Sequence, residues 1–332
     1  MKIHILFDFE KPSGGGKNFL MALRSEFEKA GVHTASPKDA DVILFNSHQT
    51  LKEVFQLKLK FSEKLFVHRI DGPICSYRKN QKYIDKAIFE INKLVANGTV
   101  FQSKWSQTEN KKMMGANFAF DAVILNGANR CLFNKDNKAV FEPTRKIRLI
   151  AASWSKSDLK GFDVLLFLDK QLDFAKYEMV FAGESPLEFT NIKVLGKIPQ
   201  DDLAKRLKQS DIFISTSRVE ACSNALIEAL SCGLPCLAFN SSSNPEVLQG
   251  GGELFSNEQD LLLKIEKIRQ NYRRYQNNLP VYSMQKTTQE YLQFMTNLCY
   301  DIKKPKRIGF LGYLRFLWVQ IFLIKGKIFN KI

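Results

Sequence analysis

The amino-acid sequence predicts an α/β protein with two domains, each built around a parallel β-sheet. Short apolar runs alternate with stretches of helical periodicity, and this alternation begins a second time after Phe141–Thr144. Strands that alternate with helices form parallel sheets that are covered on both faces. The length of 332 residues also exceeds that of one typical compact domain. The sequence therefore favours two domains of similar kind.

The first series of elements occupies residues 1–143. Gly31 and Asn97-Gly98 each follow a stretch in which apolar residues recur every three to four positions, so both stretches are predicted to be helices. The expected strands are 2–7, 41–45, 65–70, 99–102 and 123–125, and the expected helices are 19–30 and 82–96.

The second series occupies residues 144–284. Its expected strands are 147–152, 178–182, 191–195, 211–215 and 235–239, and its expected helices are 162–169, 201–209 and a third from about 222 to Gly233. After Phe239 the sequence is polar and then mostly helical to about residue 300. We expect 285–302 to be a helix that packs back on the first domain, and 303–332 to be a basic, aromatic tail.

The distribution of charge limits the classes of partner. The net charge of +15 favours an anionic partner, which includes nucleic acid, anionic lipid and phosphorylated small molecules. Eight basic residues and no acidic residue lie between Lys303 and Lys331, so more than half of the excess belongs to an aromatic, apolar tail. That distribution disfavours nucleic acid, which is bound by basic grooves and helices.

The cysteines and the N-terminus indicate the compartment. The six cysteines form no CxxC pair, and no histidine stands near Cys232 and Cys236 to complete a zinc site. We therefore expect reduced, packed cysteines. The chain begins directly as a strand followed by acidic residues, which does not match a signal peptide. Both observations predict a cytoplasmic protein.

Ligands bind to parallel sheets beyond the carboxyl ends of the strands, where helix N-termini point. After the first strand comes Pro12–Asn18, a loop whose three glycines allow a close backbone approach to a phosphate or a sugar. A Walker A loop would need glycine at Lys11 and serine or threonine at Asn18, and a dinucleotide fingerprint would need glycine at Phe19. Neither motif is present, and a plain connector is the alternative interpretation.

Polar residues follow two further strands of the first domain. His68, Arg69 and Asp71 bring an imidazole, a guanidinium and a carboxylate to the end of the strand 65–70. Burying such charged groups costs free energy unless they pair with each other or bind a ligand. The alternative interpretation is an ion pair between Arg69 and Asp71 that fixes a loop. Asn126-Gly127 follows the strand 123–125, where a simple turn is the alternative.

In the second domain, two strand-end loops carry candidate residues. Lys160 precedes Gly161 at a helix start, which suits a phosphate, and a solvated surface lysine is the alternative. The segment RVEACSNALIEALSCGLPC (218–236) follows the strand 211–215. Ser223 is the expected N-cap of the next helix, and the first amides of that helix are available to an anion.

This segment also contains two glutamates. Glu220 precedes the helix, and Glu228 lies inside it among apolar residues. A carboxylate in such surroundings needs hydrogen-bond donors, such as a ribose diol. The alternatives are a capped surface helix, and a Glu228 that pairs with a distant lysine or arginine.

Taken together, these loops resemble the retaining glycosyltransferases of family 4, over about residues 1–300. The most specific part is the pair Glu220 and Glu228, which matches the family's two glutamates separated by seven residues. The other matching segments are Gly14-Gly15-Gly16, Asn126-Gly127, Lys160-Gly161, Asn191–Gly196, Ser223–Ala229, Cys232–Pro235, Pro245-Glu246 and Gly250–Gly252. The resemblance implies the GT-B architecture, in which two Rossmann-like domains face each other across a cleft. The acceptor domain would be 1–143, and the nucleotide-sugar domain would be 144–284.

The resemblance also implies roles for single residues. Glu220 would contact hydroxyls of the donor sugar, and Glu228 would hold the ribose hydroxyls. Lys160 and the amides of Ser223 and Asn224 would neutralise the diphosphate leaving group.

The remaining roles fall mainly on the first domain. Gly15 and Gly16 would let that domain close on the diphosphate. The acceptor side would hold two catalytic candidates, His68 and Asp71, together with Arg69 and Asn126.

One position departs from the family pattern. The family usually has an arginine about five residues before the lysine, where this chain has Ser155. Lys156 is the candidate for the second positive charge, as a point charge instead of a bidentate fork.

Family members need no bound metal, and the strand-end loops of the second domain contain no Asp-x-Asp motif. The resemblance implies retention through attack on the same face of the sugar, so we name no carboxylate nucleophile.

The chain ends in IGFLGYLRFLWVQIFLIKGKIFNKI, residues 308–332. Its apolar core, Phe316–Ile324, is shorter than the ~20 residues that span a bilayer, and Arg315 interrupts the longer run. Flanking basic residues and frequent aromatic residues predict a helix that lies in the headgroup region of an anionic inner leaflet. The alternative is a final helix that packs on the first domain, a role that 287–299 could also fill.

The resemblance therefore implies a hexosyltransferase that moves a sugar, with retention, from a nucleotide-diphosphate donor to a glycan or lipid-linked acceptor, and we expect a role in cell-surface polysaccharide synthesis. We expect it in the cytoplasm, at the inner face of the cell membrane, with no metal or other cofactor and no nucleic-acid partner. Two alternatives are a nucleotide-sugar epimerase of the same architecture and a non-catalytic, membrane-bound sugar-nucleotide or glycan-binding protein.

Overall fold

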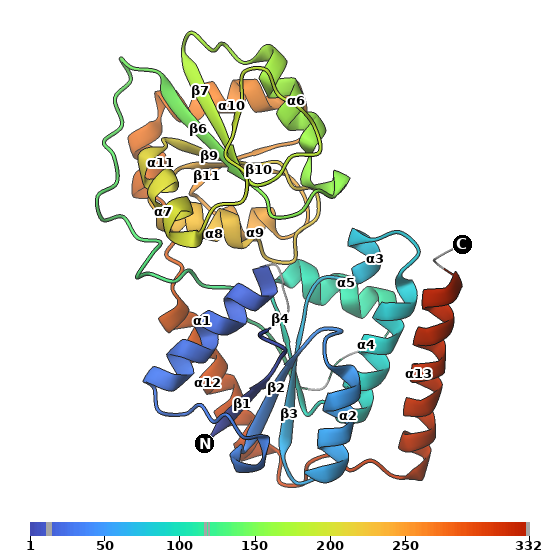
Figure 1. The fold of residues 1–332 in the computed structure, drawn as a ribbon. Helices are drawn as coiled ribbons and strands as arrows, with labels where there is room; N and C mark the ends of the chain where they lie inside the picture. Colours follow the sequence, from blue (N-terminus) through green and yellow to red (C-terminus); the bar gives the residue numbers. More distant parts are fainter. Residues whose placement is uncertain (11–14, 116–117, 119, 330–332) are drawn as a thin grey trace. The chain divides into compact units, whose positions relative to one another are not determined.

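The chain forms two α/β units (Figure 1), seen in a computed structural model that describes residues 1–10, 15–115, 118 and 120–329, without the side chains of 327–329. Unit 1 consists of residues 1–125 and 285–332, and unit 2 of residues 126–284. The sequence pattern placed the boundary between the two domains at residue 143, just before the second series of strands begins. The segment before it belongs to unit 2 because its backbone is held there: the Ala139 amide donates to the Lys208 carbonyl at 2.9 Å.

Unit 1 contains a five-stranded sheet, all parallel, in the order β1-β2-β3-β4-β5. The strands are β1 (Ile3–Leu6), β2 (Val42–Asn46), β3 (Leu65–Ile70), β4 (Gly98–Phe101) and β5 (Asp121–Val123). Every residue of β2, β3 and β4 is buried, which explains the mostly apolar runs in the sequence. All five carboxyl ends lie along one edge.

Helices cover both faces of this sheet. They are α1 (Gly15–Lys29), α2 (Leu51–Lys60), α3 (Ile74–Tyr77), α4 (Lys82–Val95), α5 (Lys104–Met114), α12 (Met284–Asp301) and α13 (Phe310–Phe329), with a 3₁₀ helix η1 at Pro37–Asp39. Figure 1 shows α1 and α12 on one side of the sheet, and α2, α4 and α13 on the other. Gly98 allows the approach of α12, because a Cβ there would lie 2.9 Å from the Phe294 ring.

The basic tail forms α13, whose inner face completes the core of unit 1. Phe316 stacks on Phe55 of α2 with ring centres 3.6 Å apart, and Val319 is fully buried. Arg315 forms an ion pair with Glu90 of α4. The helix therefore packs on unit 1, which the sequence had left as the alternative interpretation, while its outer face stays exposed.

Unit 2 contains a six-stranded parallel sheet in the order β11-β10-β9-β6-β7-β8. The strands are β6 (Ile147–Ala152), β7 (Tyr177–Ala182), β8 (Lys193–Val194), β9 (Ile212–Ser215), β10 (Cys236–Phe239) and β11 (Gly252–Phe255). The helices are η2 (Asp158–Lys160), α6 (Phe162–Gln171), α7 (Gln200–Gln209), α8 (Asn224–Ser231), α9 (Asn244–Leu248), α10 (Glu258–Gln270) and α11 (Tyr272–Asn277).

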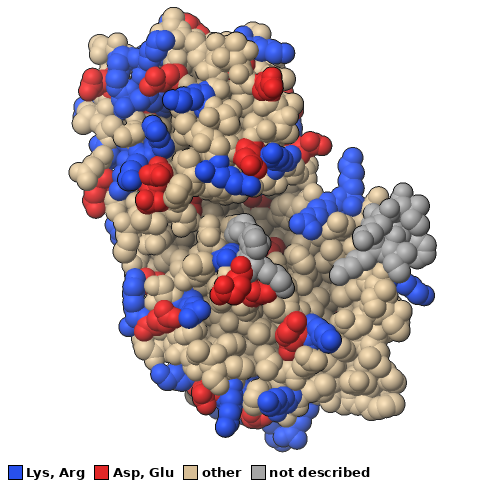
Figure 2. Space-filling view, in the orientation of Figure 1, with Lys and Arg blue, Asp and Glu red and all other residues tan. Residues whose placement is uncertain are grey.

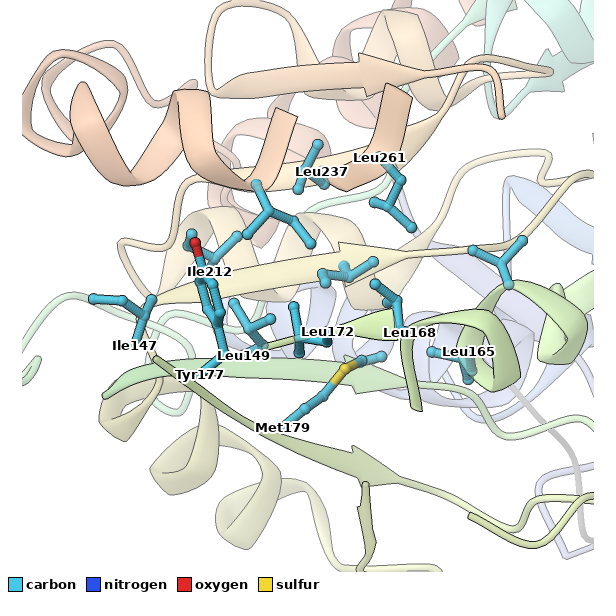
Figure 3. Packing of buried hydrophobic residues seen from close by; sticks show 14 of the residues in the cluster. Ile147, Leu149, Leu165, Leu168, Leu172, Tyr177, Met179, Ile212, Leu237 and Leu261 are labelled. Carbon is cyan, nitrogen blue, oxygen red and sulfur yellow. The ribbon is translucent and has the colours of Figure 1, made fainter. Parts of the chain in front are cut away.

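The core of unit 2 lies between this sheet and the helices α6 and α10. Figure 3 shows Ile147 and Leu149 of β6 with Leu165 and Leu168 of α6, and with Leu261 of α10. The five side chains are at most 1% exposed. This packing fixes β6 and β9 side by side in the middle of the sheet, so their carboxyl-end loops become neighbours.

The sequence did not reveal every element. It missed β11 because the strand begins in a run of glycines, which is typical of a turn. Gly252 sits so close to β10 that a Cβ would lie 1.8 Å from the Cys236 carbonyl oxygen. It also missed α2 and the polar helix α5, each of which occupies a stretch that we had left unassigned. Among the described residues, we find no helix with the length and apolar character needed to span a bilayer.

Candidate active site

Two loops at the carboxyl edge of unit 2 are bonded to each other. They are residues 153–161 after β6 and residues 216–223 after β9. The Thr216 hydroxyl donates to the Lys160 carbonyl at 2.6 Å, and the Arg218 amide donates to the Leu159 carbonyl at 2.8 Å. The backbones approach so closely that a Cβ on Gly161, where φ is +70°, would lie 2.3 Å from the Thr216 carbonyl oxygen. Glycine at 161 is therefore a requirement of this contact.

The two charged residues that the sequence singled out meet across these loops. Lys160 Nζ donates to Glu220 Oε1 at 2.6 Å, and the side chains are 23% and 16% exposed. Lys160 is thus paired and largely buried, unlike a solvated surface lysine. A third loop, after β10, holds the Glu220 backbone: its amide donates to Ser242 Oγ at 2.9 Å, and its carbonyl accepts from the Ser243 amide at 3.2 Å.

Arg218 is a residue of this site that sequence reasoning missed. Its guanidinium donates two hydrogen bonds to Asp163 of α6, at 2.8 and 2.5 Å. This pair holds the pKa of Asp163 below its ordinary value. Its position two residues before Glu220 was the available signal, because an arginine in a strand-end loop can fix that loop with a bidentate pair.

The first turn of α8 is capped and held from one side. Ser223 is the N-cap, as the sequence predicted, and its Oγ accepts from the Leu226 amide at 3.3 Å. The Asn126 side-chain amide donates to Asn224 Oδ1 at 2.8 Å and to the Cys222 carbonyl at 3.3 Å. Asn126, which we had expected on the acceptor side with Arg69, therefore belongs to unit 2 and positions the loop that leads into α8.

Glu228 lies one turn further along α8. It is half-buried, and its carboxylate has no hydrogen-bond or ion-pair partner among the residues that the structure describes. Burial raises the pKa of this carboxyl from its ordinary value near 4.5 to about 8. The alternative, a Glu228 that pairs with a distant lysine or arginine, is not found in the described part of the chain. This carboxyl group is thus available for hydrogen bonds with a ligand.

The candidate second cation lies apart from this pair. Lys156 is exposed, and its Nζ lies 3.7 Å from Glu184, which also pairs with Lys197 at 3.0 Å. These two lysines lower the pKa of Glu184. At the position where the family has arginine, the Ser155 amide donates to Ser153 Oγ at 3.3 Å. The cation in contact with Glu220 is therefore Lys160, and not Lys156.

His68, a catalytic candidate from the sequence, lies in the core of unit 1. Its side chain is 0% exposed and stacks on Phe45 with ring centres 4.1 Å apart. Nε2 lies 2.9 Å from the Ser47 carbonyl oxygen and Nδ1 lies 3.2 Å from the Asn92 side-chain amide, which fits one neutral tautomer. Burial lowers the pKa of the ring to about 3. The structure thus gives His68 a packing role in place of the expected contact with an acceptor.

Arg69 and Asp71 form the pair that the sequence named as an alternative. Arg69 is 1% exposed, and its Nη1 donates to Asp71 Oδ1 at 3.1 Å and to Asn46 Oδ1 at 2.7 Å. Its guanidinium also lies 4.3 Å from the centre of the Phe19 ring. Asp71 keeps 27% of its side chain exposed and also accepts from Gln102. Of the three residues, Asp71 is the one that a solute can reach.

The end of β2 contributes polar groups that the sequence analysis passed over. The buried Ser47 Oγ and His48 Nδ1 have no hydrogen-bond partner among the residues that the structure describes. Ser47 and Thr50 adopt left-handed backbone conformations, with φ of 40° and 56°. Such conformations are rare for residues other than glycine and gather at functional sites. The same strand-end argument that selected Asp71 would have selected this loop.

The predicted glycine-rich loop lies only partly within the described residues. Gly15 and Gly16 already belong to the first turn of α1, while Gly14 and the preceding three residues lie outside the described residues. Among the described residues, no group of three or more His, Cys, Asp or Glu side chains is placed to hold a metal ion.

Part of the chain, including this site, is similar to a known family. The sequence profile of the family described as "Glycosyl transferases group 1" matches residues 135–279, which include Lys160, Glu220 and Glu228. A protein named "Probable sucrose-phosphate synthase" from Thermosipho melanesiensis is 26% identical over 166 residues, and the match covers 46% of this chain and 39% of that protein. An "Uncharacterized 41.2 kDa protein in cps region" from Klebsiella pneumoniae is 27% identical over 139 residues, with 40% and 38% covered. The matched segment thus spans well under half of these relatives.

Solved structures match the fold over most of the chain. The Anabaena protein HepE, in complex with UDP, superposes with a TM-score of 0.68 at 15% identity, over 90% of this chain and 100% of that chain. Sucrose-phosphate synthase from Thermosynechococcus elongatus gives a TM-score of 0.61 at 16% identity, over 86% and 78%. Two parallel-sheet α/β units and these neighbours establish the GT-B architecture that the sequence predicted.

Proposed function

We propose that the chain is a retaining glycosyltransferase of family 4, which the match of residues 135–279 to the glycosyl transferases group 1 family supports. It moves a hexose from a nucleotide-diphosphate donor to a glycan or lipid-linked acceptor. The observation that carries this proposal is the Lys160–Glu220 contact of 2.6 Å beside the capped start of α8. It brings a cation, a carboxylate and the first amides of α8 to one edge of the sheet.

Lys160 and the first turn of α8 would stabilise the leaving group. When the bond between the sugar C1 and the phosphate oxygen breaks, negative charge develops on the departing diphosphate. Lys160 and the amides of Ser223 and Asn224 would stabilise that charge without moving, because the loop contacts described above hold them in place. Lys156 is exposed, and its ion-pair partner within the described part of the chain is Glu184, so it is the candidate that turns toward a diphosphate when one binds. In this proposal the reaction needs no bound metal.

The two glutamates serve the rest of the donor. Glu220 would accept hydrogen bonds from hydroxyls of the transferred sugar, and Glu228 would accept them from the ribose diol. The ribose assignment rests on the half-buried Glu228 carboxylate, which has no partner in the described part of the chain. A carboxylate in that position becomes satisfied when two hydroxyl donors arrive.

The acceptor would bind to the strand ends of unit 1. Asp71 is the reachable carboxylate there, and Arg69 fixes it. The acceptor oxygen forms its bond to C1 on the face from which the diphosphate leaves, the bond between C1 and the phosphate oxygen breaks, and the acceptor proton passes to the departing diphosphate oxygen. Retention follows from this geometry of attack and requires no carboxylate nucleophile. We place the reaction in cell-surface polysaccharide synthesis in the cytoplasm, at the inner face of the cell membrane.

A donor screen tests the proposal. The neighbours solved with UDP and UDP-glucose make UDP-sugars the first ligands to try, followed by other nucleotide sugars. We expect one of them to raise the melting temperature and to be hydrolysed slowly without an acceptor. Lys160→Ala should lose both effects, whereas Lys205→Ala, which changes an exposed lysine of α7, should keep them. Stabilisation of Lys160→Ala equal to that of the wild type would refute the site, and release of an epimerised sugar would identify an epimerase instead.

A further inference from the structure

Helix α13 has two faces of different character. Its inner face is fixed to unit 1 by the Phe316–Phe55 stack, by the fully buried Val319 and by the Arg315–Glu90 ion pair. Lys86 of α4 adds a cation–π contact to the Trp318 ring at 4.9 Å. The helix is therefore an integral part of unit 1, and its outer face is exposed to solvent while the inner face stays packed.

The outer face of α13 is apolar and exposed. Its members are Phe310 (76% exposed), Leu311 (80%), Leu314 (44%), Leu317 (40%), Trp318 (44%), Ile321 (53%) and Ile324 (58%). Residues 311, 314, 318 and 321 follow one another at intervals of three and four, so they form one stripe along the helix. Figure 2 shows mainly uncharged surface on the flank of unit 1 that carries α13. A contiguous apolar surface of this kind marks a place of interaction.

Basic residues stand at the ends of this stripe. Lys303, Lys304 and Arg307 are exposed just before the helix, and Lys325 is exposed near its end. Residues 302–332 contain eight lysines and arginines and no aspartate or glutamate. An apolar stripe with basic ends is complementary to a bilayer surface that carries anionic headgroups. A second copy of this chain would instead bring these exposed lysines and arginines close to the same residues of its partner.

We propose that the outer face of α13 docks unit 1 on an anionic lipid bilayer, with the helix lying parallel to the membrane plane. The leucine and isoleucine side chains enter the boundary between headgroups and acyl chains, and Trp318 lies at headgroup level. The lysines and arginines at both ends contact phosphate groups. This docking goes beyond the transfer reaction and does not depend on it. In combination with the proposed function, it brings the acceptor-side unit to the surface where a lipid-linked acceptor resides.

Vesicle flotation tests the docking. The full-length protein is mixed with vesicles of phosphatidylcholine, or of equal parts phosphatidylcholine and phosphatidylglycerol. We expect it to float with the anionic vesicles, and increasing salt should release part of it. The triple variant Leu311→Gln/Leu314→Gln/Ile321→Gln should reduce the partition coefficient about tenfold or more. The matched control, Leu263→Gln/Val281→Gln, removes two side chains of unit 2 that are 71% and 69% exposed and should bind like the wild type.

A second measurement reports the position of the helix itself. In a variant with Trp105 and Trp154 replaced by phenylalanine, brominated phospholipid should quench the emission of Trp318. The complementary variant that keeps only Trp154 should show no quenching. Equal flotation of the triple variant and the wild type, or the absence of Trp318 quenching, would overturn the docking. A dimer in vesicle-free solution that the triple variant abolishes would overturn it in favour of a second copy.

The same variants separate this proposal from the proposed function. Stabilisation by a nucleotide sugar is measured in solution without vesicles, where the triple variant should respond like the wild type. If the wild type binds vesicles but no nucleotide sugar, the docking stands and the transfer function fails. If it binds a donor but no vesicle, the docking alone fails.

Discussion

Lys160 Nζ and Glu220 Oε1 lie 2.6 Å apart, so in the free protein each of the two groups neutralises the other. Both lie at the carboxyl edge of unit 2, on loops that are also joined through their backbones. A donor diphosphate would compete with Glu220 for the lysine, and a sugar hydroxyl would compete with Lys160 for the carboxylate. The ion pair thus neutralises two partly buried charges until a donor binds, whose diphosphate replaces Glu220 as the partner of Lys160 and whose sugar hydroxyl replaces Lys160 as the partner of Glu220.

Replacement of Lys160 by alanine should lower kcat on the true donor by about 10²–10³-fold, because a fixed charge that stabilises the leaving group is lost. The free energy of unfolding should fall by no more than about 1 kcal/mol, since the ion pair is partly exposed. Steady-state kinetics and urea unfolding measure the two effects. Lys160→Arg keeps the charge and should retain part of the activity. A variant Lys160→Ala with wild-type turnover would exclude the proposed role.

Replacement of Glu220 should also lower turnover by orders of magnitude, for a different reason. The alanine variant loses the hydrogen-bond acceptor that orients the sugar, and it leaves Lys160 without its partner in the free protein. We expect about a 10²-fold loss in kcat for Glu220→Ala, with a smaller loss for Glu220→Gln, which retains an acceptor oxygen. Comparison of the two variants in single-turnover assays tests the role. Equal activity of Glu220→Ala and the wild type would contradict it.

Gly161→Ala should destabilise unit 2 by several kcal/mol, because the added Cβ would lie 2.3 Å from the Thr216 carbonyl oxygen. Gly196 offers a matched control in the same unit. Both glycines have φ of +70°, but a Cβ on Gly196 would meet no atom within 4 Å. Gly196→Ala should therefore cost only about 1 kcal/mol, the backbone strain alone. Urea unfolding of both variants separates the cost of backbone strain from the cost of the steric clash. Equal losses in the free energy of unfolding would show that the contact between Gly161 and Thr216 is unimportant.

The raised pKa of Glu228 predicts a pH-dependent stability. The folded state holds the proton up to about pH 8, whereas the unfolded chain releases it near 4.5. The folded state therefore binds more protons between these values, and the contribution of Glu228 to stability falls as the pH rises through that window. Glu228→Gln should remove this slope, so the difference in melting temperature between variant and wild type should grow from pH 5 to pH 8. Parallel melting curves would contradict the shift.

His68 should behave as a neutral core residue. Its ring pKa of about 3 lies below that of an unfolded histidine, so its contribution to stability is present above about pH 6.5 and is lost as the pH falls toward 3. His68→Ala should lower the free energy of unfolding by about 2–4 kcal/mol, through the lost stack on Phe45 and two lost hydrogen bonds. Titration by NMR should show no protonation of this ring between pH 5 and 8. A midpoint near 6.5 would exclude the packing role.

The sequence identified most strands of the two sheets and the residues that the structure brings together at the carboxyl edge of unit 2. The strands β3 and β6 were predicted with the observed bounds, because buried parallel strands leave continuous apolar runs between turn signals. Lys160, Glu220 and Ser223 were predicted because they follow strands or open a helix, and such positions can be read from the order of elements alone.

Other features depend on contacts that no local pattern contains. His68 and Asp71 both stand at the end of β3, but only packing against Phe45 shows that the first is core and the second is accessible. Asn126 looked like the end of unit 1, and its contact with Asn224 places it in unit 2. The packing of α13 could not be inferred either, because apolar residues occur on both of its faces.

Unit 1 is assembled from both ends of the chain, and this has a consequence for synthesis on the ribosome. Residues 1–125 emerge first, but α12 and α13 emerge only after the whole of unit 2. Until then, Phe55 and the apolar side of α4 lack the cover that Phe316 and Val319 provide. Unit 2 is continuous and can fold as soon as it has emerged. Part of the core of residues 1–125 therefore stays uncovered during synthesis until α13 has emerged.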